Sequence, residues 1–347
     1  MLLEKLSNAF GPSGNEDEVR RVLARALRDK VDDLRTDALG NLIAFKKGSG
    51  PAPRLKVMID AHTDEVGLMI TRIDKNGLLG FRTVGGIDAR MLPAKGVLVG
   101  PKQLPGVIVA PPIHLTKPEQ RKQVFKIEQL AIDVGASSED TAKGLVKIGD
   151  YVAFDTKFEI LSDEGLRTAK GKAFDDRAGC AAAALLADES YPVDVYLSFS
   201  AQEEVGLRGA RVAAYHLEPD LAIALEGTVC DDTPKEQDVS PTTELGKGPA
   251  ITVMDHSFVA DRRLNRLLVE TAKAEKIPYQ FKQPGVGGTD AGAIHLARSG
   301  VPSAAVAVPC RYIHAPTGIL SLNDLDNLVA LVKATLRALP DHWQGQD

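Results

Sequence analysis

Three short apolar runs in this sequence are each followed by acidic or histidine residues, and this pattern constrains the fold more than any other feature. The runs span residues 55–60, 193–200 and 221–225. Their length predicts strands, and helix-like segments lie between them, which favours an α/β fold: a mixed sheet with helices on both faces. Proteins of this class bind ligands at the carboxyl ends of such strands.

Helical spacing and turn residues predict the remaining elements of the α/β fold. Val19, Leu23 and Leu27 indicate an amphipathic helix that begins after a turn rich in Gly and Pro. Ser321 and Asp324 form a variant of the capping box, with Asp in place of Glu, at the start of a C-terminal helix. We expect further strands at 41–45 and 303–308, and helices at 179–186, 261–276 and 322–339.

Residues 67–161 differ from the rest of the chain, because Gly and Pro recur there every few positions. β-rich pieces such as 96–99 and 106–109 lie between these turn residues, which predicts a small, mostly β, barrel-like domain. We therefore expect residues 1–66 and 162–347 to form the α/β domain, into which residues 67–161 are inserted. Polar clusters from the two halves of the α/β domain then come together.

The composition excludes several classes of function. The chain has 347 residues, and its formal net charge of −5 provides no polycationic surface for nucleic acid. No apolar stretch approaches the ~18 residues of a membrane span, and the N-terminus does not resemble a signal peptide. Three distant cysteines (Cys180, Cys230 and Cys310) favour reduced thiols over a disulfide framework or a thiolate zinc site. We expect a cytoplasmic protein.

Five clusters contain residue types that bind metal ions. They are His62 with Asp64, Asp175 with Asp176, Glu203 with Glu204, Glu226, and His314. Each cluster alone is a weak signal, because a single histidine is usually packed or exposed and adjacent acids usually face solvent. Glu203 and Glu204 are more informative, since they follow an apolar strand. Two carboxylates near a core repel each other and lose solvation unless a cation compensates them.

Histidine and carboxylate ligands without cysteine suit Zn²⁺, Co²⁺ or Mn²⁺. Two such ions need about five protein ligands, one of them bridging, and the clusters contain two histidines and at least three carboxylates. Ions about 3.5–4 Å apart polarise a carbonyl and lower the pKa of a shared water. A carboxylate that is not bound to metal then accepts the proton of that water. The clusters therefore predict a site with two divalent ions.

The motifs DAHTDEVG, KAFDDRAG, SAQEEVGLRGA, GGTDAGAIH and RYIHAPTG together resemble the M42 family of metallo-aminopeptidases. The similarity covers essentially the whole chain, and the motif set is specific because order, spacing and strand context agree. The resemblance implies a catalytic α/β domain and an inserted β domain through which subunits dimerise. It also implies that dimers assemble into a hollow tetrahedral dodecamer, which limits access to unfolded peptides.

The resemblance assigns a role to each clustered residue. His62 matches a metal ligand, and Asp64 matches the acid that orients this histidine. Asp175 matches a carboxylate that bridges both ions, and the family implies a cis peptide bond between it and Asp176. Glu203 matches the general base.

Three further residues complete the implied ligand set. His62, Asp175 and Glu204 are assigned to one ion, and Asp175, Glu226 and His314 to the other. Glu226 departs from the family pattern, in which Asp is more frequent at this position, and its longer side chain puts the spacing and preference of the metals in doubt.

The implied activity is hydrolysis of N-terminal residues from short peptides. The ions hold the scissile carbonyl and the free α-amine of the substrate, and Glu203 deprotonates a bridging water and returns the proton to the leaving amine. Acidic, aliphatic and basic N-terminal residues are all served within the family, and no motif in this chain selects among them.

Three alternative functions fit this sequence less well. A deacylase or carboxypeptidase of the M20 type uses similar metals, but its inserted domain is a ferredoxin-like lid that follows the Glu-Glu pair. A glycoside hydrolase needs an aromatic platform, which one Trp and 5% aromatic residues supply poorly. A non-enzymatic binding protein is expected to have lost Glu203 or a ligand, and none is lost.

Other histidines, acids and cysteines are given lesser roles. Asp290 and His295 belong to a glycine-rich loop that the resemblance implies shapes the pocket without binding metal. His256 is expected either to line the substrate site or to be structural, and Cys310 to be packed. The remaining histidines, His114, His216 and His342, are expected on the surface.

Overall fold

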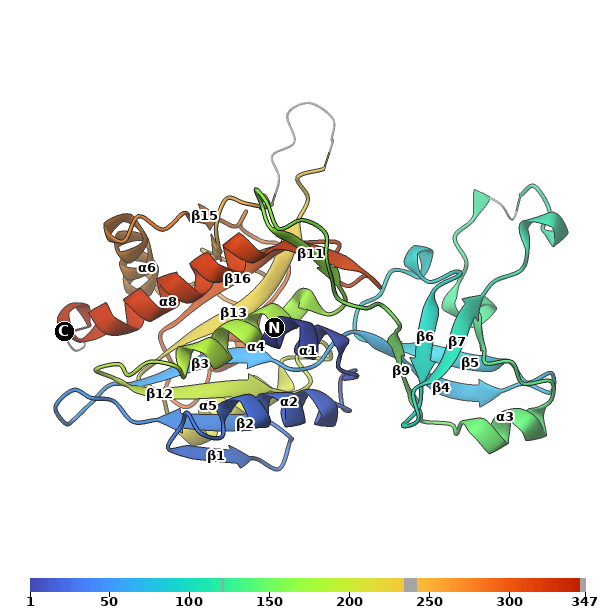
Figure 1. Ribbon diagram of the computed structural model, residues 1–347, viewed down its shortest axis with the longest axis horizontal. Helices are drawn as coiled ribbons and strands as arrows, with labels where there is room; N and C mark the ends of the chain where they lie inside the picture. Colours follow the sequence, from blue (N-terminus) through green and yellow to red (C-terminus); the bar gives the residue numbers. More distant parts are fainter. Residues whose placement is uncertain (120–121, 234–241, 344–347) are drawn as a thin grey trace.

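The computed structural model describes residues 1–119, 122–233 and 242–343, so the last four residues of the expected α/β domain lie outside it. The described residues form two lobes, a larger one built on an 11-stranded sheet and a smaller one built on a closed barrel (Figure 1). This confirms the expected α/β fold with an inserted, mostly β barrel. No described helix combines the length and apolar character needed to cross a bilayer.

The large sheet is mixed, and its centre is parallel. Its main path runs in the order β1 (Asp33–Thr36), β2 (Leu42–Lys46), β12 (Asp194–Ser200), β3 (Lys56–His62), β13 (Leu221–Cys230), β16 (Ser303–Arg311), β17 (Gly318–Ser321), β11 (Thr168–Gly171) and β10 (Glu159–Ile160). Two short strands, β14 (Ala250–Ile251) and β15 (Gln280–Phe281), extend it beside β16. Because β12, β3, β13 and β16 are parallel neighbours, their carboxyl ends meet at one edge.

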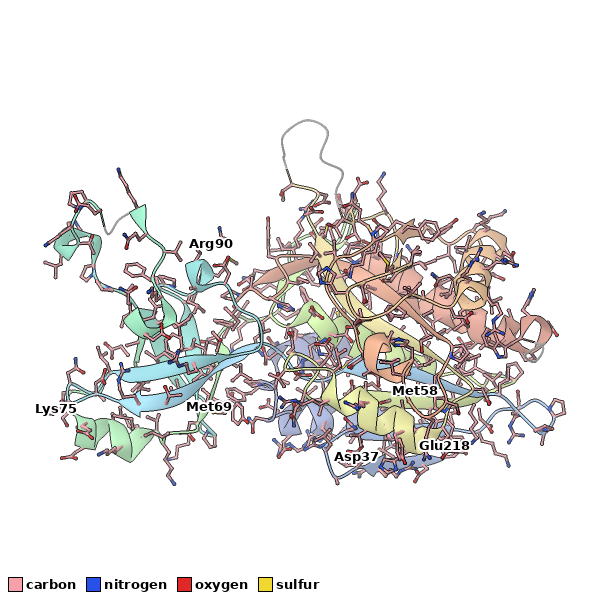
Figure 2. The ribbon with its side chains drawn as sticks, turned by 180° about the vertical axis from the view of Figure 1, so that it is seen from behind. Asp37, Met58, Met69, Lys75, Arg90 and Glu218 are labelled. Atoms are coloured by element: carbon pink, nitrogen blue, oxygen red, sulfur yellow. The ribbon has the colours of Figure 1, made fainter. Side chains whose placement is uncertain are left out.

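Helices cover both faces of this sheet. The first face packs against α1 (Leu2–Asn8), α2 (Asp17–Leu27), α4 (Phe174–Leu186), α6 (Arg262–Ala274) and α8 (Leu322–His342), and the second against α5 (Arg208–Leu217) and α7 (Ala291–Ile294). The strands alternate accordingly: Val57 and Ile59 face the first core, and Met58 faces the second. Figure 2 shows Met58 in the larger lobe, on the side that carries α5 and α7.

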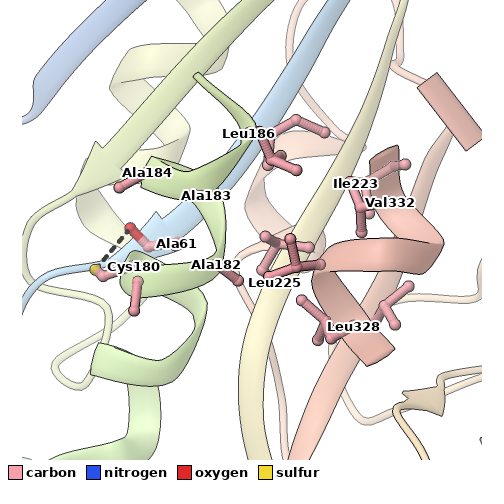
Figure 3. Close-up of a cluster of buried hydrophobic side chains, with 14 of the residues drawn as sticks. Ala61, Cys180, Ala182, Ala183, Ala184, Leu186, Ile223, Leu225, Leu328 and Val332 are labelled. Carbon is pink, nitrogen blue, oxygen red and sulfur yellow. Dashed lines mark hydrogen bonds between the residues drawn. The ribbon is translucent and has the colours of Figure 1, made fainter. Parts of the chain in front are cut away.

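Small residues allow α4 to approach the sheet closely. Its alanines, among them Ala182 and Ala183, are fully buried against Ile223 and Leu225 of β13, and Leu328 of α8 closes the cluster (Figure 3). Truncating a buried leucine of this kind to alanine costs about 2–5 kcal/mol of folding free energy. This packing fixes the start of α4, where Asp175 lies, relative to β13.

The smaller lobe is a closed six-stranded barrel with its own hydrophobic core. Its strands are β4 (Gly67–Ile73), β5 (Leu79–Val84), β6 (Gly96–Val99), β7 (Leu104–Val109), β8 (Ala131–Asp133) and β9 (Tyr151–Phe154). Short helices connect them: α3 (Glu139–Leu145), η1 (Ala89–Met91), η2 (Ile113–Leu115) and η4 (Ile127–Gln129). The barrel strands lie within the expected insertion of residues 67–161, whereas β10, also within that range, pairs with β11 of the large sheet.

Two elements differ from the sequence-based expectation. The strand expected at 221–225 extends to Cys230, so Glu226 lies inside β13 and not after its end. Its pairing with β16 continues through Glu226↔Ala307, because backbone hydrogen bonds do not require an apolar side chain. At the start of α8, Ser321 caps the backbone of Asp324 as expected, but the Asp324 carboxylate instead accepts hydrogen bonds from the backbone of Gly246 and Gly248.

Candidate metal centre

All seven residues that the sequence analysis singled out as ligand, base or orienting group lie at the carboxyl edge of the parallel strands. They are His62 at the end of β3, Asp64 two residues later, Asp175 in the first turn of α4, Glu203 and Glu204 after β12, Glu226 in β13, and His314 after β16. They come from chain segments more than 250 residues apart, and the sheet order brings them together.

The two imidazoles approach opposite oxygens of Asp175. His62 Nε2 is 3.1 Å from Asp175 Oδ1, and His314 Nε2 is 3.5 Å from Asp175 Oδ2. Each ring also faces a second carboxylate, because His62 Nε2 is 3.6 Å from Glu226 Oε2 and His314 Nε2 is 3.3 Å from Glu204 Oε2. Asp175 therefore lies between two pairs, each of one histidine and one glutamate.

Burial disfavours the ionised form of the carboxylates in this cluster. Burial raises the pKa of Glu204 and Glu226 well above their usual range. Burial lowers the pKa of His314, but its hydrogen bond to Asp175 and the nearby Glu204 raise it to about 9. Potential ligand atoms of His62, Asp175 and Glu204 lie within 4.8 Å of one another, so the donor set fits divalent cations.

Both histidines are held through Nδ1, which leaves Nε2 for a metal ion. His62 Nδ1 lies 3.2 Å from the carbonyl oxygen of Asp64 and 3.4 Å from its Oδ1. His314 Nδ1 lies 3.0 Å from the carbonyl oxygen of Gly86, which belongs to the barrel lobe. Such acceptors fix the tautomer and the ring orientation of a metal-binding histidine. The barrel therefore contributes directly to the site.

Asp64 connects the histidine to the Glu-Glu turn. Its carboxylate accepts hydrogen bonds from the backbone N–H of Glu203 (2.9 Å) and Glu204 (3.1 Å), and from the Ser13 hydroxyl (2.6 Å). Burial raises the pKa of Asp64, but its hydrogen bonds, above all the one with His62, lower the pKa by more, so the net pKa lies below its usual value. Asp64 is therefore ionised, and it holds both the His62 ring and the Glu203–Glu204 turn in position.

Glu203 has the features of a general base. Its side chain is 12% exposed, and its Oε2 is 3.9 Å from His62 Nε2. Burial raises the pKa of Glu203 to about 7, which suits a group that must accept and release a proton near neutrality. Glu203 and Glu204 both line a pocket of about 490 Å³, together with Glu226 and His314.

The backbone around the site adopts rare conformations. The peptide bond between Asp175 and Asp176 is cis, as the resemblance implied. The Asp176 carboxylate accepts hydrogen bonds from the backbone N–H of His62 (3.2 Å) and Gly179 (2.8 Å), so it positions β3 against α4. Gln202 and His314 have left-handed φ angles of 60° and 55°, a conformation that is uncommon for non-glycine residues.

The lesser candidates lie beside or outside this centre. Asp290 is buried, accepts a hydrogen bond from Ser200 and donates its backbone N–H to Glu226 Oε1 (3.0 Å), so it positions Glu226. His295 contacts its own helix through Ala291. Cys310 is buried, and all three cysteines are free; His114, His216, His256 and His342 are exposed.

Sequence reasoning missed several charged residues around the centre. Lys172 donates hydrogen bonds to both oxygens of Glu65 (2.6 and 2.8 Å), and these two side chains are only 3% exposed. The backbone N–H of Gly11 also donates to Glu65 and so ties the N-terminal turn to the site. Lys282 lines the same pocket as Glu203. Lysines in polar sequence carry no signal of burial, although Glu65 directly follows the His62 cluster.

Comparison with known proteins identifies relatives along nearly the whole chain. The family model described as M42 glutamyl aminopeptidase matches residues 40–331. The chain is 35% identical to the lysyl aminopeptidase of Pyrococcus furiosus over 97% of its own length and 96% of that protein.

Two solved structures share the fold closely. A TET aminopeptidase from the archaeon Thaumarchaeota archaeon SCGC AB-539-E09 matches with a TM-score of 0.92 and 36% identity, over 97% of this chain and 96% of that one. The Pyrococcus horikoshii TET1 peptidase, which can assemble into a tetrahedron or a large octahedral shell, matches with a TM-score of 0.84 and 37% identity, over 96% and 97% of the two chains.

Proposed function

The chain belongs to the M42 aminopeptidase family, and we propose that it removes N-terminal residues from short peptides with the help of two divalent ions. The observation that carries the proposal is the position of Asp175 between two histidine–glutamate pairs. A carboxylate with one oxygen toward each pair is suited to bridge two ions. Zn²⁺ or Co²⁺ fits the nitrogen and oxygen donors best, and Mn²⁺ is also compatible.

Ligand atoms of His62, Asp175 and Glu204 lie within 4.8 Å of one another, which agrees with the resemblance, but the shortest histidine–glutamate distances favour a different division of ligands. Glu226 Oε2 is 3.6 Å from His62 Nε2, and Glu204 Oε2 is 3.3 Å from His314 Nε2. We therefore assign His62, Asp175 and Glu226 to one ion, and His314, Asp175 and Glu204 to the other. The ligand residues are unchanged, and only the two glutamates exchange partners.

The ions, when bound, supply polarisation of the scissile carbonyl and acidification of a water. Glu203 supplies the proton transfer: its carboxylate, with a pKa of about 7, accepts a proton from the attacking water and returns it to the leaving amine. Asp64 holds the Glu203 backbone in place, which keeps this carboxylate over the pocket. With its α-amine held at the same centre, the substrate is cleaved only at its N-terminus.

The position of the inserted domain supports this function over an M20-type deacylase. The barrel strands run from Gly67 to Phe154, before Asp175, and form a closed barrel, whereas the M20 alternative needs a lid after Glu204. We further propose that the barrel mediates dimerisation and that dimers assemble into a dodecamer in the cytoplasm. The assemblies formed by the Pyrococcus horikoshii relative and the three free, buried cysteines support this picture.

A panel of aminoacyl-p-nitroanilides tests the proposal. The purified protein is assayed as isolated, after chelation and after readdition of Zn²⁺ or Co²⁺, and the same substrates are offered with acetylated α-amines. We expect hydrolysis of free-amine substrates only, loss of activity on chelation and recovery with metal. Glu203→Gln should reduce kcat by at least about 100-fold while metal content is retained. Activity that survives complete metal removal, or an unchanged rate in Glu203→Gln, contradicts the mechanism.

A further inference from the structure

Lys282 is a buried cation that forms no ion pair with any side chain that the structure describes. It directly follows β15 at the wall of the pocket that contains Glu203, and the residue is only 5% exposed. Its backbone N–H donates to the carbonyl of Ile251, which fixes the main chain. Its ammonium group, however, makes no hydrogen bond and no ion pair within the part of the chain that the structure describes.

The Lys282 ammonium is open to the pocket. Several described side chains have polar atoms that are buried from solvent and make no hydrogen bond, and the Lys282 ammonium is not one of these buried groups. Its Nζ lies 3.7 Å from the position that a Cβ on Gly287 would occupy, and the absence of a side chain there leaves the ammonium uncovered. Apolar residues, Val229, Val286 and Ile313, form other parts of the pocket wall.

The nearest acids are already engaged by other groups. Asp255 accepts hydrogen bonds from the backbone of Ser257 and Phe258 and from the Thr289 hydroxyl. Glu226 accepts the backbone N–H of Asp290 and faces His62. Burial lowers the pKa of Lys282, while the fields of Asp255, Glu226 and Asp175 raise it. Once cations bind Glu226 and Asp175, these two carboxylates compensate the positive charge of Lys282 even less.

A buried charge without a partner is costly, and sites of this kind are found where a ligand supplies the partner. The metal centre and Lys282 line one pocket of about 490 Å³, large enough for an amino-acid side chain. A substrate whose α-amine and scissile carbonyl lie at the centre directs the side chain of its first residue into this pocket.

We propose that Lys282 determines the substrate specificity of the enzyme, by pairing with the side-chain carboxylate of an acidic N-terminal residue. The inference rests on the proposed aminopeptidase function and adds the substrate class, peptides that begin with Glu or Asp. The apolar wall packs against the methylene groups of the substrate, and the ammonium lies where the carboxylate arrives. An N-terminal lysine would instead place two cations together, which is strongly unfavourable.

The metal-loaded full-length enzyme tests this proposal with Glu-, Asp-, Leu- and Lys-p-nitroanilide. We expect the wild type to have its highest kcat/KM on the acidic substrates. Lys282→Met keeps the length and packing of the side chain but removes the charge, so kcat/KM for the Glu substrate should fall by about 10- to 100-fold. Leucyl hydrolysis should change by less than about 3-fold. Lys282→Glu should shift the preference toward the lysyl substrate.

Controls separate specificity from a structural role. Lys273→Met removes an exposed lysine from α6 and should leave the whole profile unchanged. Lys282→Arg keeps the charge and should retain the acidic preference. A preference of the wild type for leucyl or lysyl substrates overturns the proposal, as does an equal loss on every substrate in Lys282→Met, which indicates that Lys282 only offsets the charge of the centre. Absence of hydrolysis of all four substrates by the metal-loaded wild type overturns the proposed function itself.

Discussion

Asp64 is the residue on which the geometry of the centre depends most, although it faces no proposed metal ion directly. It lies beside His62 Nδ1 and binds the backbone of both Glu203 and Glu204. Asp64→Ala removes these contacts together, so we expect kcat/KM to fall by about 10- to 100-fold, with a matching loss of metal affinity. Steady-state kinetics and metal analysis after dialysis measure the two effects.

Ser13→Ala provides the matched control for Asp64. It removes only the hydroxyl that donates to Asp64 Oδ2 and leaves the two backbone hydrogen bonds intact. Because only one of the hydrogen bonds to the Asp64 carboxylate is removed, we expect a smaller loss of kcat/KM than in Asp64→Ala. Equal losses of kcat/KM in the two variants would mean that the Ser13 hydroxyl, and not the hydrogen bonds from Asp64 to the Glu203–Glu204 turn, determines the geometry of the centre.

Asp194, which lies far from the metal centre, should make the stability of the fold depend on pH. Asp194 accepts hydrogen bonds from Arg54 Nε and Gly48 N–H, both at 2.7 Å, and both charged side chains are 16% exposed. Burial raises the pKa of Asp194, but these partners lower it to a net value below its usual one. The ionised carboxylate therefore stabilises the fold above the unfolded-state pKa of about 4, and this contribution is lost as the pH falls through the folded-state pKa.

Asp194→Asn should accordingly lower the free energy of unfolding by about 1–2 kcal/mol at pH 7. The difference from the wild type should shrink as the pH is lowered toward about 3. Thermal or urea unfolding at several pH values measures this. Asp33→Asn is the control, because its ion pair with Arg35 is about half exposed and such pairs contribute little. A difference that does not vary with pH would exclude the charge of Asp194 as its cause.

At the scale of elements, the close approach of β13 to α4 sets the position of Asp175. A Cβ at Gly227 would lie 2.8 Å from Asp175 Cα and 3.0 Å from its Cβ, closer than real Cβ contacts allow. Gly227→Ala should therefore displace Asp175 and reduce kcat by about 100-fold, since misplacement by ~1 Å is enough for such a loss. Overpacking should also cost about 1–3 kcal/mol of stability. Kinetics and thermal unfolding distinguish the two effects.

Gly144→Ala is the control for this substitution. Gly144 lies in α3, and no atom lies within 4 Å of its added Cβ. We expect unchanged activity and a gain of up to about 1 kcal/mol in stability, because alanine is the better helix former. Full activity in Gly227→Ala would show that the approach of β13 does not limit the position of Asp175.

At the scale of the whole molecule, the two lobes have separate cores but share one site. Among the described residues, the core of the large sheet contains none from the barrel, and β4 pairs with β9 at Leu68↔Val152, so the ends of the inserted barrel are adjacent. The Gly86 carbonyl of the barrel nevertheless accepts from His314. We therefore expect the barrel to be separable in folding but not in function.

Replacing residues 67–154 with a short Gly-Ser linker tests this separation. We expect a folded large lobe, with a cooperative thermal transition and native-like circular dichroism, that lacks peptidase activity because His314 has lost the Gly86 carbonyl. Light scattering should report a monomer for the excised protein and a dimer or larger assembly for the full-length chain. An excised protein that keeps its activity, or its oligomeric size, would refute the role of the barrel.

The sequence determined the chemistry and the order of the elements. Short apolar runs predicted the central strands, and carboxylates such as Glu203 and Glu204 next to those runs predicted cations, because buried charge must be compensated. The Gly- and Pro-rich segment predicted the barrel for an equally local reason, since turn residues act on their own neighbours. The strand and barrel predictions are confirmed because each depends on residues close together in the chain, whereas the cations remain a prediction.

Only the tertiary structure decided which residues meet. The pairing of His62 with Glu226 and of His314 with Glu204 depends on the order of β3, β13 and β16 in the sheet, which local sequence does not encode. The continuation of β13 past Glu226 depends on its pairing with β16. The open ammonium of Lys282 likewise exists only because long-range packing buries its side chain beside the centre, where no described residue forms an ion pair with it.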